Sequence, residues 1–256
     1  MPAYGLNALG FLTGKEPADE ASGDGQPAGN TGFWDQRTAL EWVRNNISSF
    51  FRNLDNITVD GYSAGALSAF QQLAHGLYHV YEDDAIINRM SMISNSPGVQ
   101  AKTLQQHQKQ FDEYITQLGV PLDVDDDKKL ERLRAIPFGK WITIQSEMDI
   151  SEFRAVSDGV FYPTSLTNDI NSGDFAKRMR SRNITLINGE CREEHHMYRN
   201  WRTPENAYSS LYSRLCGEYP ENVSRALLQH YRGPSQSLPS GCADWQELFG
   251  RIYADV

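Results

Sequence analysis

The sequence predicts an α/β fold built on a parallel sheet, and its pattern and its length support this. Short β-rich runs alternate with longer stretches of helical periodicity, as they do when parallel strands are joined by crossover helices. The 256 residues are enough for one large domain or two small ones, with a substantial buried core. We find no internal repeat.

In the first part of the chain, residues 14–32 are rich in Gly, Pro and acids, so we interpret them as a surface loop. A helix follows and stops near residues 45–46; its apolar positions are Trp34, Leu40, Trp42 and Val43. The β-rich run NITVDG at residues 56–61 predicts a buried strand, and residues 66–80 predict a helix. Residues 89–93 (RMSMI) predict a second strand, which SNSPG ends.

The rest of the chain is mainly helical. Residues 101–150 are charged, and four apolar positions fall on one face of a helix: Leu104, Phe111, Ile115 and Leu118. The block LDVDDDKKLERLRAI begins with acids and ends with bases, which suits the helix dipole. Residues 184–189 (ITLING) predict a third strand. Three more helices are expected near 204–215, 220–231 and 243–254.

The stretch ITVDGYSAGALS contains a G-x-S-x-G motif around Ser63. In a nucleophile elbow, a sharp turn between a strand and a helix exposes the serine Oγ above the sheet. The next N–H, here that of Ala64, then points at the developing oxyanion. So tight a turn needs small side chains on both sides of the serine, and the sequence has Gly61, Ala64 and Gly65 there. The order strand, serine, helix favours this interpretation over a turn that merely contains a serine.

The surrounding residues carry a longer resemblance. GNTGFWDQRTALEWVRNNI, followed by ITVDGYSAG, resembles the G-N-x-G-x-x-D-Q-x-x-A-L-x-W-V-x-x-N-I and I-T-x-x-G-x-S-A-G segments of the type-B carboxylesterase/lipase family, most of all its fungal branch. YGLNALGFL, SNSPG, LERLRAIP, SDGVFYP and GECREEHHMY extend the likeness over nearly the whole chain. The resemblance implies an α/β-hydrolase fold and a serine esterase that needs no cofactor or metal and acts on a small-molecule ester.

The resemblance also implies a catalytic acid in a G-x-x-x-D-E-like pattern after a strand. In GECREE this register places Glu194 in that role, with Glu193 as the competing choice. Such an acid orients a histidine and stabilises the imidazolium that forms when the histidine takes the serine proton. Composition alone favours an exposed polar loop. A metal site of Glu193, Glu194, His195 and His196 is disfavoured, because adjacent residues cannot all face one ion and H-E-x-x-H spacing is absent.

Two parts of the family's machinery are not found in this sequence. Its histidine should lie about a hundred residues beyond the acid, but only His195, His196 and His230 follow Glu194. We interpret each of the three as a solvated or packing residue. No H-G-G segment, the source of the second oxyanion donor, occurs. We therefore expect one partial domain over 1–256, truncated at both ends, with a mostly helical insertion at about 101–150.

The same reasoning predicts an incomplete sheet. In the family's usual sheet order a third strand lies beside the strand before Ser63, and its absence leaves that strand with an unpaired edge. Tyr62 is a smaller departure, since many members carry Glu there. Phe161 and Tyr162, in SDGVFYP, could line the acyl side of the site, although we favour ordinary core positions.

Three functions follow from these observations. The first is a carboxylic-ester hydrolase by family, of low or no activity in this chain. The alternatives are a non-catalytic cholinesterase-like binding domain and an inactive fragment. The present Ser63 and Glu194 favour the enzyme, whereas the absent base favours the alternatives.

Composition excludes other classes of protein. The net charge of −9 argues against general binding of nucleic acid or anionic membranes. No run approaches the roughly 18 apolar residues of a membrane helix, and the first residues lack the basic start of a signal peptide. The sequence leaves open the compartment, the oligomeric state and the pairing of Cys191, Cys216 and Cys242.

Overall fold

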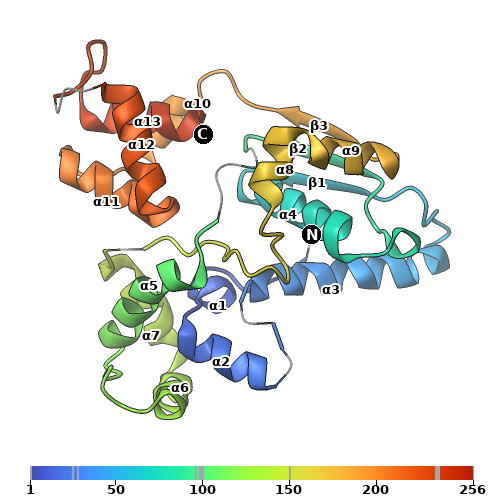
Figure 1. The fold of residues 1–256 in the computed structure, drawn as a ribbon, viewed down its shortest axis with the longest axis horizontal. Coiled ribbons are helices and arrows are strands. Elements are labelled where there is room, and N and C mark those ends of the chain that lie inside the picture. The colour runs from blue at the N-terminus through green and yellow to red at the C-terminus, as the bar shows by residue number, and fades with distance from the viewer. Residues whose placement is uncertain are drawn as a thin grey trace.

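A parallel sheet lies on one side of the computed structural model, which describes residues 2–24, 26–27, 29–95, 97, 101–149, 151–233 and 237–255 (Figure 1). Its strands β1 (Thr58–Tyr62), β2 (Arg89–Ile93) and β3 (Thr185–Gly189) lie in the order β1-β2-β3. Both pairs are parallel, so the carboxyl ends of all three strands meet at one edge of the sheet. The three predicted strands and their parallel pairing are confirmed.

Some of the helices lie beside the sheet, and the others form two groups away from it (Figure 1). The helices up to the second strand are α1 (Ala8–Phe11), α2 (Lys15–Gly23), α3 (Thr31–Asn46) and α4 (Ala64–His79). The middle of the chain contains α5 (Leu104–Gln117), α6 (Asp126–Arg134), α7 (Phe138–Thr143), α8 (Leu166–Ser172) and α9 (Asp174–Ser181). The last are α10 (Glu194–Asn200), α11 (Tyr208–Glu218), α12 (Glu221–Arg232) and α13 (Trp245–Asp255). Short 3₁₀ turns lie at Ile47–Phe50, Glu82–Asp84 and Ile144–Glu147.

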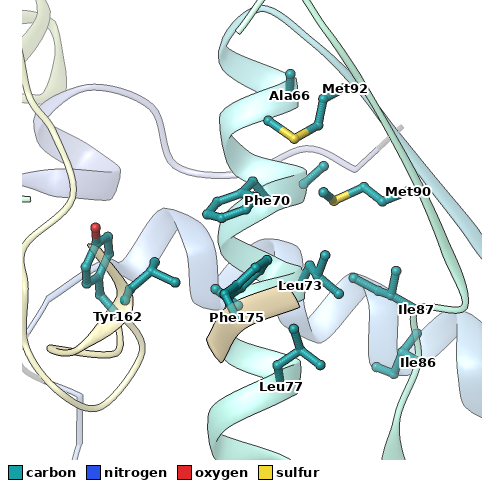
Figure 2. Packing of buried hydrophobic residues seen from close by; sticks show 13 residues of the cluster. Ala66, Phe70, Leu73, Leu77, Ile86, Ile87, Met90, Met92, Tyr162 and Phe175 are labelled. Atoms are coloured by element: carbon teal, nitrogen blue, oxygen red, sulfur yellow. The ribbon is translucent and has the colours of Figure 1, made fainter. Parts of the chain in front are cut away.

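Helix α4 follows Ser63 and packs its apolar face against the sheet (Figure 2). Ala66, Phe70, Leu73 and Leu77 recur at helical spacing and are all buried. From β2, Met90 and Met92 point to the same face because strand residues two apart share a side. Fully burying an apolar side chain of this size contributes about 1.5–3 kcal/mol, so this cluster fixes α4, and with it the turn at Ser63, to the sheet.

Polar contacts of the GNTGFWDQ run hold helix α3 to three other parts of the chain. Asn30 is buried, and its amide exchanges two hydrogen bonds with the backbone of Val156, each 2.9 Å long. The Asp35 carboxylate accepts the Gly5 N–H at 2.9 Å. The Gln72 amide, on α4, donates to the Phe33 carbonyl at 2.7 Å. These side chains therefore join segments that are far apart in the sequence.

The interpretation of residues 14–32 as a loop is wrong for Lys15–Gly23, which form helix α2; Gly25 and Ala28 lie outside the described residues. Pro17 occupies the first turn, where a missing N–H costs little. Glu16 is buried and pairs with Lys129 of α6 at 2.8 Å. The local composition favoured a loop, but this tertiary ion pair and the burial of Ala18 stabilise a helix.

The predicted helical content of residues 101–150 is confirmed, except at Ile150, which is not among the described residues. Helix α5 begins with a capping box at Thr103 and Gln106. It buries Phe111, Tyr114 and Ile115 in a second apolar cluster. That the segment is an insertion in a single partial domain stays a prediction.

The three expected C-terminal helices are confirmed as α11, α12 and α13, each shifted by a few residues. They pack around a third apolar cluster that includes Leu211, Leu215, Leu228 and Phe249. Helix α10 was not predicted. It lies against α13, where Gly250 allows the two backbones to approach closely.

The composition of NITVDG predicts a buried strand, but this is wrong for β1. Its residues alternate between exposed and half-buried. It is an edge strand, and no other described strand pairs with its outer side, as expected. Ahead of β1 the described residues form helices and no strand, and the first of these helices is α1.

Candidate active site

Ser63 occupies the turn between β1 and α4 in a strained backbone conformation. Its φ of 55° and ψ of −123° are unusual for a residue with a side chain. Its N–H donates to the Ile93 carbonyl at 2.8 Å, and its carbonyl accepts from the Ala66 N–H at 2.9 Å and the Asn95 amide at 3.2 Å. The neighbouring strand and helix therefore hold the turn in this conformation.

Two glycines flank the serine, and only one is required by close packing. A Cβ on Gly61 would lie 2.1 Å from the Gly65 carbonyl oxygen, so strand and helix touch there. A Cβ on Gly65 would meet nothing within 4 Å, so the expected need for smallness at Gly65 is not found. Ala64 is the first residue of α4, and its N–H is among the helix N-terminal amides that lack a partner in the helix.

The carboxyl ends of the strands border a cavity of about 310 Å³ that contains Ser63. The same cavity includes both candidate acids, Glu193 and Glu194. Its lining is Tyr62, Ser63, Ser94, Cys191, Glu193, Glu194, Met197 and Trp201. The structure thus brings together the sequence-predicted serine and acid. Among these lining residues there is no histidine.

Sequence reasoning did not assign Ser94, Asn95, Met197 or Trp201 to the site. A signal existed for Ser94 and Asn95, because they follow β2, and the ends of adjacent parallel strands meet at one edge. Ser94 has a φ of 58° and donates its N–H to the Gly189 carbonyl at 2.8 Å. Met197 and Trp201 had no such signal, since they lie in and just after the unpredicted helix α10.

The two adjacent glutamates face different partners. Glu194 accepts the Cys191 N–H at 2.8 Å and borders both this cavity and a second one of about 210 Å³. Burial, followed by the negative charge of Glu194, raises the pKa of Tyr198. The Glu193 carboxylate instead lies 3.3 Å from His196 Nε2 and 3.8 Å from His195 Nε2.

None of the three histidines after the acid lines the Ser63 cavity. His195 and His196 lie on α10 with their rings toward Glu193. His230 is exposed on α12, far along the chain from the site. The structure therefore places none of these three histidines beside Ser63 as a base.

Phe161 and Tyr162 are buried, as the favoured core interpretation expects. Phe161 stacks on the His75 ring at 4.5 Å, and burial lowers the pKa of His75 to about 4. Tyr162 borders the second cavity rather than the one around Ser63. The exposed Tyr62 does line the Ser63 cavity, in the position where many relatives were expected to carry Glu.

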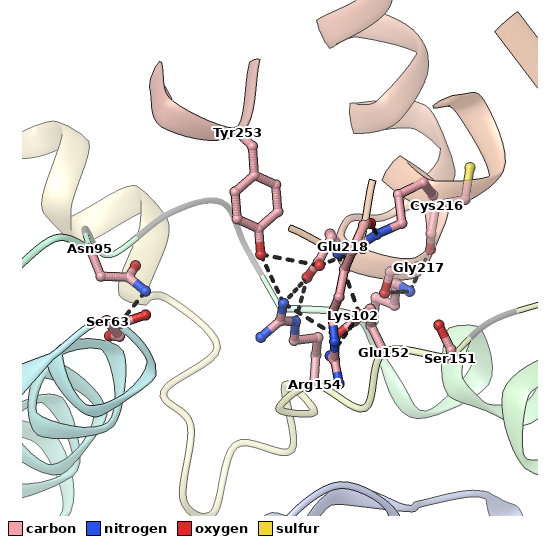
Figure 3. A network of polar contacts seen from close by, with 12 residues as sticks. Ser63, Asn95, Lys102, Ser151, Glu152, Arg154, Cys216, Gly217, Glu218 and Tyr253 are labelled. Carbon is pink, nitrogen blue, oxygen red and sulfur yellow. Dashed lines mark hydrogen bonds and ion pairs between the residues drawn. The ribbon is translucent and has the colours of Figure 1, made fainter. Parts of the chain in front are cut away.

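Charged residues of the second cavity join Lys102 and Arg154, from the middle of the chain, to the C-terminal helices (Figure 3). Glu218 pairs with Arg154 and, at 2.6 Å, with Arg214. Burial alone would raise the pKa of Glu218, but the two guanidinium groups hold it at about 2. Lys102 Nζ donates to the Cys216 and Gly217 carbonyls at 2.6 and 2.8 Å, and burial lowers its pKa to about 8.

The three cysteines are free thiols, with Cys191 exposed and Cys216 and Cys242 half-buried. Among the described residues, no helix is long and apolar enough to cross a membrane.

Comparison with known proteins identifies relatives over the whole chain. The model of the carboxylesterase family matches residues 1–251. A carboxylic ester hydrolase of Gibberella moniliformis is 51% identical over 256 residues, which are all of this chain and 47% of that protein. An uncharacterised esterase/lipase of Schizosaccharomyces pombe is 39% identical over 100% of this chain and 47% of its own length. The chain therefore spans about half the length of these relatives.

A solved structure supports the same architecture. Crystalline EstA of Aspergillus niger superposes with a TM-score of 0.66 at 21% identity, covering 98% of this chain and 47% of that one. With the parallel sheet and flanking helices, this likeness shows an α/β-hydrolase-type fold.

Proposed function

The chain belongs to the carboxylesterase family, and from that premise we propose that Ser63 is the nucleophile of a carboxylic-ester hydrolase. Its Oγ attacks the carbonyl carbon of a small-molecule ester, the alcohol leaves, and water then releases the acid from the acyl-enzyme. The Ala64 N–H donates to the oxyanion, and Glu194 is the acid that orients a histidine.

One observation carries this proposal. Ser63 combines a strained φ of 55° with a place at the carboxyl edge of a parallel sheet, in the same 310 Å³ cavity as Glu194. A serine in an ordinary turn would not need this conformation, which costs on the order of 1–3 kcal/mol. The conformation is held because Gly61 allows β1 and α4 to touch.

The same cavity supports low activity for this chain by itself. A serine hydroxyl without a base is a weak nucleophile at neutral pH. No described histidine lines the cavity. An enzyme that has lost a triad member keeps a rate enhancement of only about 10³- to 10⁴-fold over the reaction in water. We therefore propose that the chain supplies the nucleophile, one oxyanion donor and the acid, but not the general base.

Prolonged labelling with a fluorophosphonate tests this assignment. We expect slow phosphonylation of the folded chain at Ser63, located by peptide mass mapping, and faster labelling when imidazole is added as an external base. Ser63→Ala should remove the label. Ser94→Gly is the matched control, because it removes the other serine hydroxyl of the cavity, and glycine accepts the φ of 58° there.

Label spread over many serines, equal in folded and urea-unfolded chain, would show that the turn does not activate Ser63. Loss of the Ser63 label in Ser94→Gly, with an unchanged circular dichroism spectrum, would move the assignment to Ser94. Complete absence of label at Ser63 would show that this chain is not a hydrolase.

A further inference from the structure

Three metal-ligating side chains meet at the start of helix α10. One oxygen of Glu193 and one nitrogen each of His195 and His196 all lie within 4.8 Å of one another. The Glu193 Oε2 atom is 3.3 Å from His196 Nε2 and 3.8 Å from His195 Nε2. The centres of the two imidazole rings are 4.1 Å apart, so the rings lie next to each other beside the carboxylate.

These distances are close to those of ligands around one ion. Zinc binds His nitrogen and carboxylate oxygen at roughly 2.0–2.2 Å, which places ligands of a tetrahedron about 3.3 Å apart. One pair already has this spacing, and small side-chain rotations would bring in the third ligand. As expected, the four residues do not all face one point, but the side chains of Glu193, His195 and His196 do converge. Only Glu194 turns away, toward the Cys191 N–H.

The backbone that carries these ligands is held in place. A Cβ on Gly250 of α13 would lie 2.5 Å from the His195 carbonyl oxygen, so α10 and α13 are in close contact at this ligand. The His196 carbonyl accepts from the Asn200 amide at 2.8 Å. A site whose backbone is already ordered loses less conformational entropy when the ion binds.

The ligand types select the kind of ion. Two imidazoles and one carboxylate suit Zn²⁺, Ni²⁺ or Cu²⁺, whereas Ca²⁺ and Mg²⁺ prefer sites made wholly of oxygen. One cation competes nearby, since Arg192 Nε lies 3.9 Å from the other Glu193 oxygen. Its side chain is 94% exposed, so water screens the pair and a divalent ion displaces it at little cost.

We propose that Glu193, His195 and His196 form a binding site for a divalent transition-metal ion such as Zn²⁺. Because Glu193 also lines the Ser63 cavity, the ion lies at the rim of that cavity. Three protein ligands leave at least one position for water or an anion. The ion also crosslinks the first turn of α10, which carries Glu194. The inference concerns metal binding alone and does not depend on ester hydrolysis.

Zn²⁺ titration of the tag-free, EDTA-treated chain against a chromophoric chelator tests the site. We expect one ion per chain, and an affinity that falls at least tenfold in His196→Ala, in His195→Ala and in Glu193→Gln. His230→Ala and Glu194→Gln are the matched controls, because they remove an exposed histidine and the neighbouring acid that points away. Both should bind as the unaltered chain does. Circular dichroism checks that every variant is folded.

Co²⁺ absorption identifies the ligands, since the exposed thiol of Cys191 is close along the chain. We expect no thiolate charge-transfer band and no change in Cys191→Ser. Equal Zn²⁺ affinity in His196→Ala and His230→Ala would overturn the proposal. A thiolate band that disappears in Cys191→Ser would overturn it as well, because the ion would then be held by sulfur.

Discussion

At the scale of the residue, the turn at Ser63 depends on one missing side chain. Gly61 lies where β1 and α4 touch, whereas Gly65, which completes the same motif, faces open space. The motif therefore contains one glycine that packing requires and one that the described structure does not require. This difference makes the two positions a matched pair for mutation.

We expect Gly61→Ala to lower the free energy of unfolding by about 1–3 kcal/mol, the usual cost of forcing an extra methyl into a packed site. Its Cβ would meet backbone atoms of Gly65 and Ala66, which cannot rotate away. Gly65→Ala should raise stability by roughly 0.5–1 kcal/mol, because alanine is the better helix former and α4 has room. Urea unfolding followed by circular dichroism measures both. Equal effects would show that strand and helix do not touch at Gly61.

The residue scale also separates Glu194, the acid that the motif register favours, from its neighbour Glu193. Glu193 and Glu194 are chemically identical, so composition leaves either as the acid. The structure separates them because the helix begins at Glu194, whereas Glu193 precedes it with a non-helical φ of −126° and ψ of 37°. Glu194 faces Cys191 and Tyr198, and Glu193 faces the two histidines.

At the scale of the element, α10 exists because of its partner. Its seven residues, EHHMYRN, are polar and too short to be stable as an isolated helix. Its contact with α13 is close, and Arg199 pairs with Asp244 at 2.7 Å just before that helix. A local pattern of charges therefore predicted a loop, and a long-range contact made a helix.

We expect Gly250→Ala to separate α10 from α13 and to lower the free energy of unfolding by about 1–3 kcal/mol. Its Cβ would lie 2.5 Å from the His195 oxygen and 3.0 Å from the Arg199 nitrogen. In Gly250→Ala, amide hydrogen exchange should become faster in α10 than it is in the unaltered chain, whereas exchange in α4 should change less. Gly76→Ala, in α4 with nothing within 4 Å, is the control and should stabilise the chain. Unchanged exchange in α10 after Gly250→Ala would contradict the close contact.

At the scale of the whole molecule, buried charges connect the middle of the chain to the C-terminal helices (Figure 3). Lys102 lies just before α5 and caps two carbonyls at the end of α11. The nearby Glu218 is held by Arg154 and Arg214. Breaking one partner of such a buried group is costly, because the remaining charge has no water to solvate it. This network therefore couples the stability of the two parts.

Lys102 predicts a rise in stability with pH. Its folded pKa of about 8 lies below the usual 10.5, so the charged form is disfavoured in the folded chain. Between these values the unfolded chain binds more protons, and the free energy of unfolding rises with pH by at most about 3 kcal/mol. We expect this rise between pH 8 and 10.5 in urea unfolding. The rise should be absent from the curve of Lys102→Met, so the difference between the two chains should grow over this pH range. Parallel curves for both chains would contradict the prediction.

The sheet shows the other consequence at this scale. β1 keeps a free edge, and the exposed side chains of the sheet include Tyr62 and Ile187. The β-rich composition of NITVDG predicted burial. The expectation of a buried β1 is wrong because burial depends on what packs against a strand, and no other described strand pairs with the outer edge of β1.

The sequence by itself determined the three strands and several of the helices, the turn at Ser63 and the family, because apolar periodicity and motif spacing are local properties that survive without a partner. Only the tertiary structure decided that residues 15–23 are helical, that Glu194 faces the Ser63 cavity, and that Glu193 joins His195 and His196. The first two outcomes depend on contacts between residues far apart in the chain, and the third depends on the side-chain directions at the start of α10. No local pattern records either.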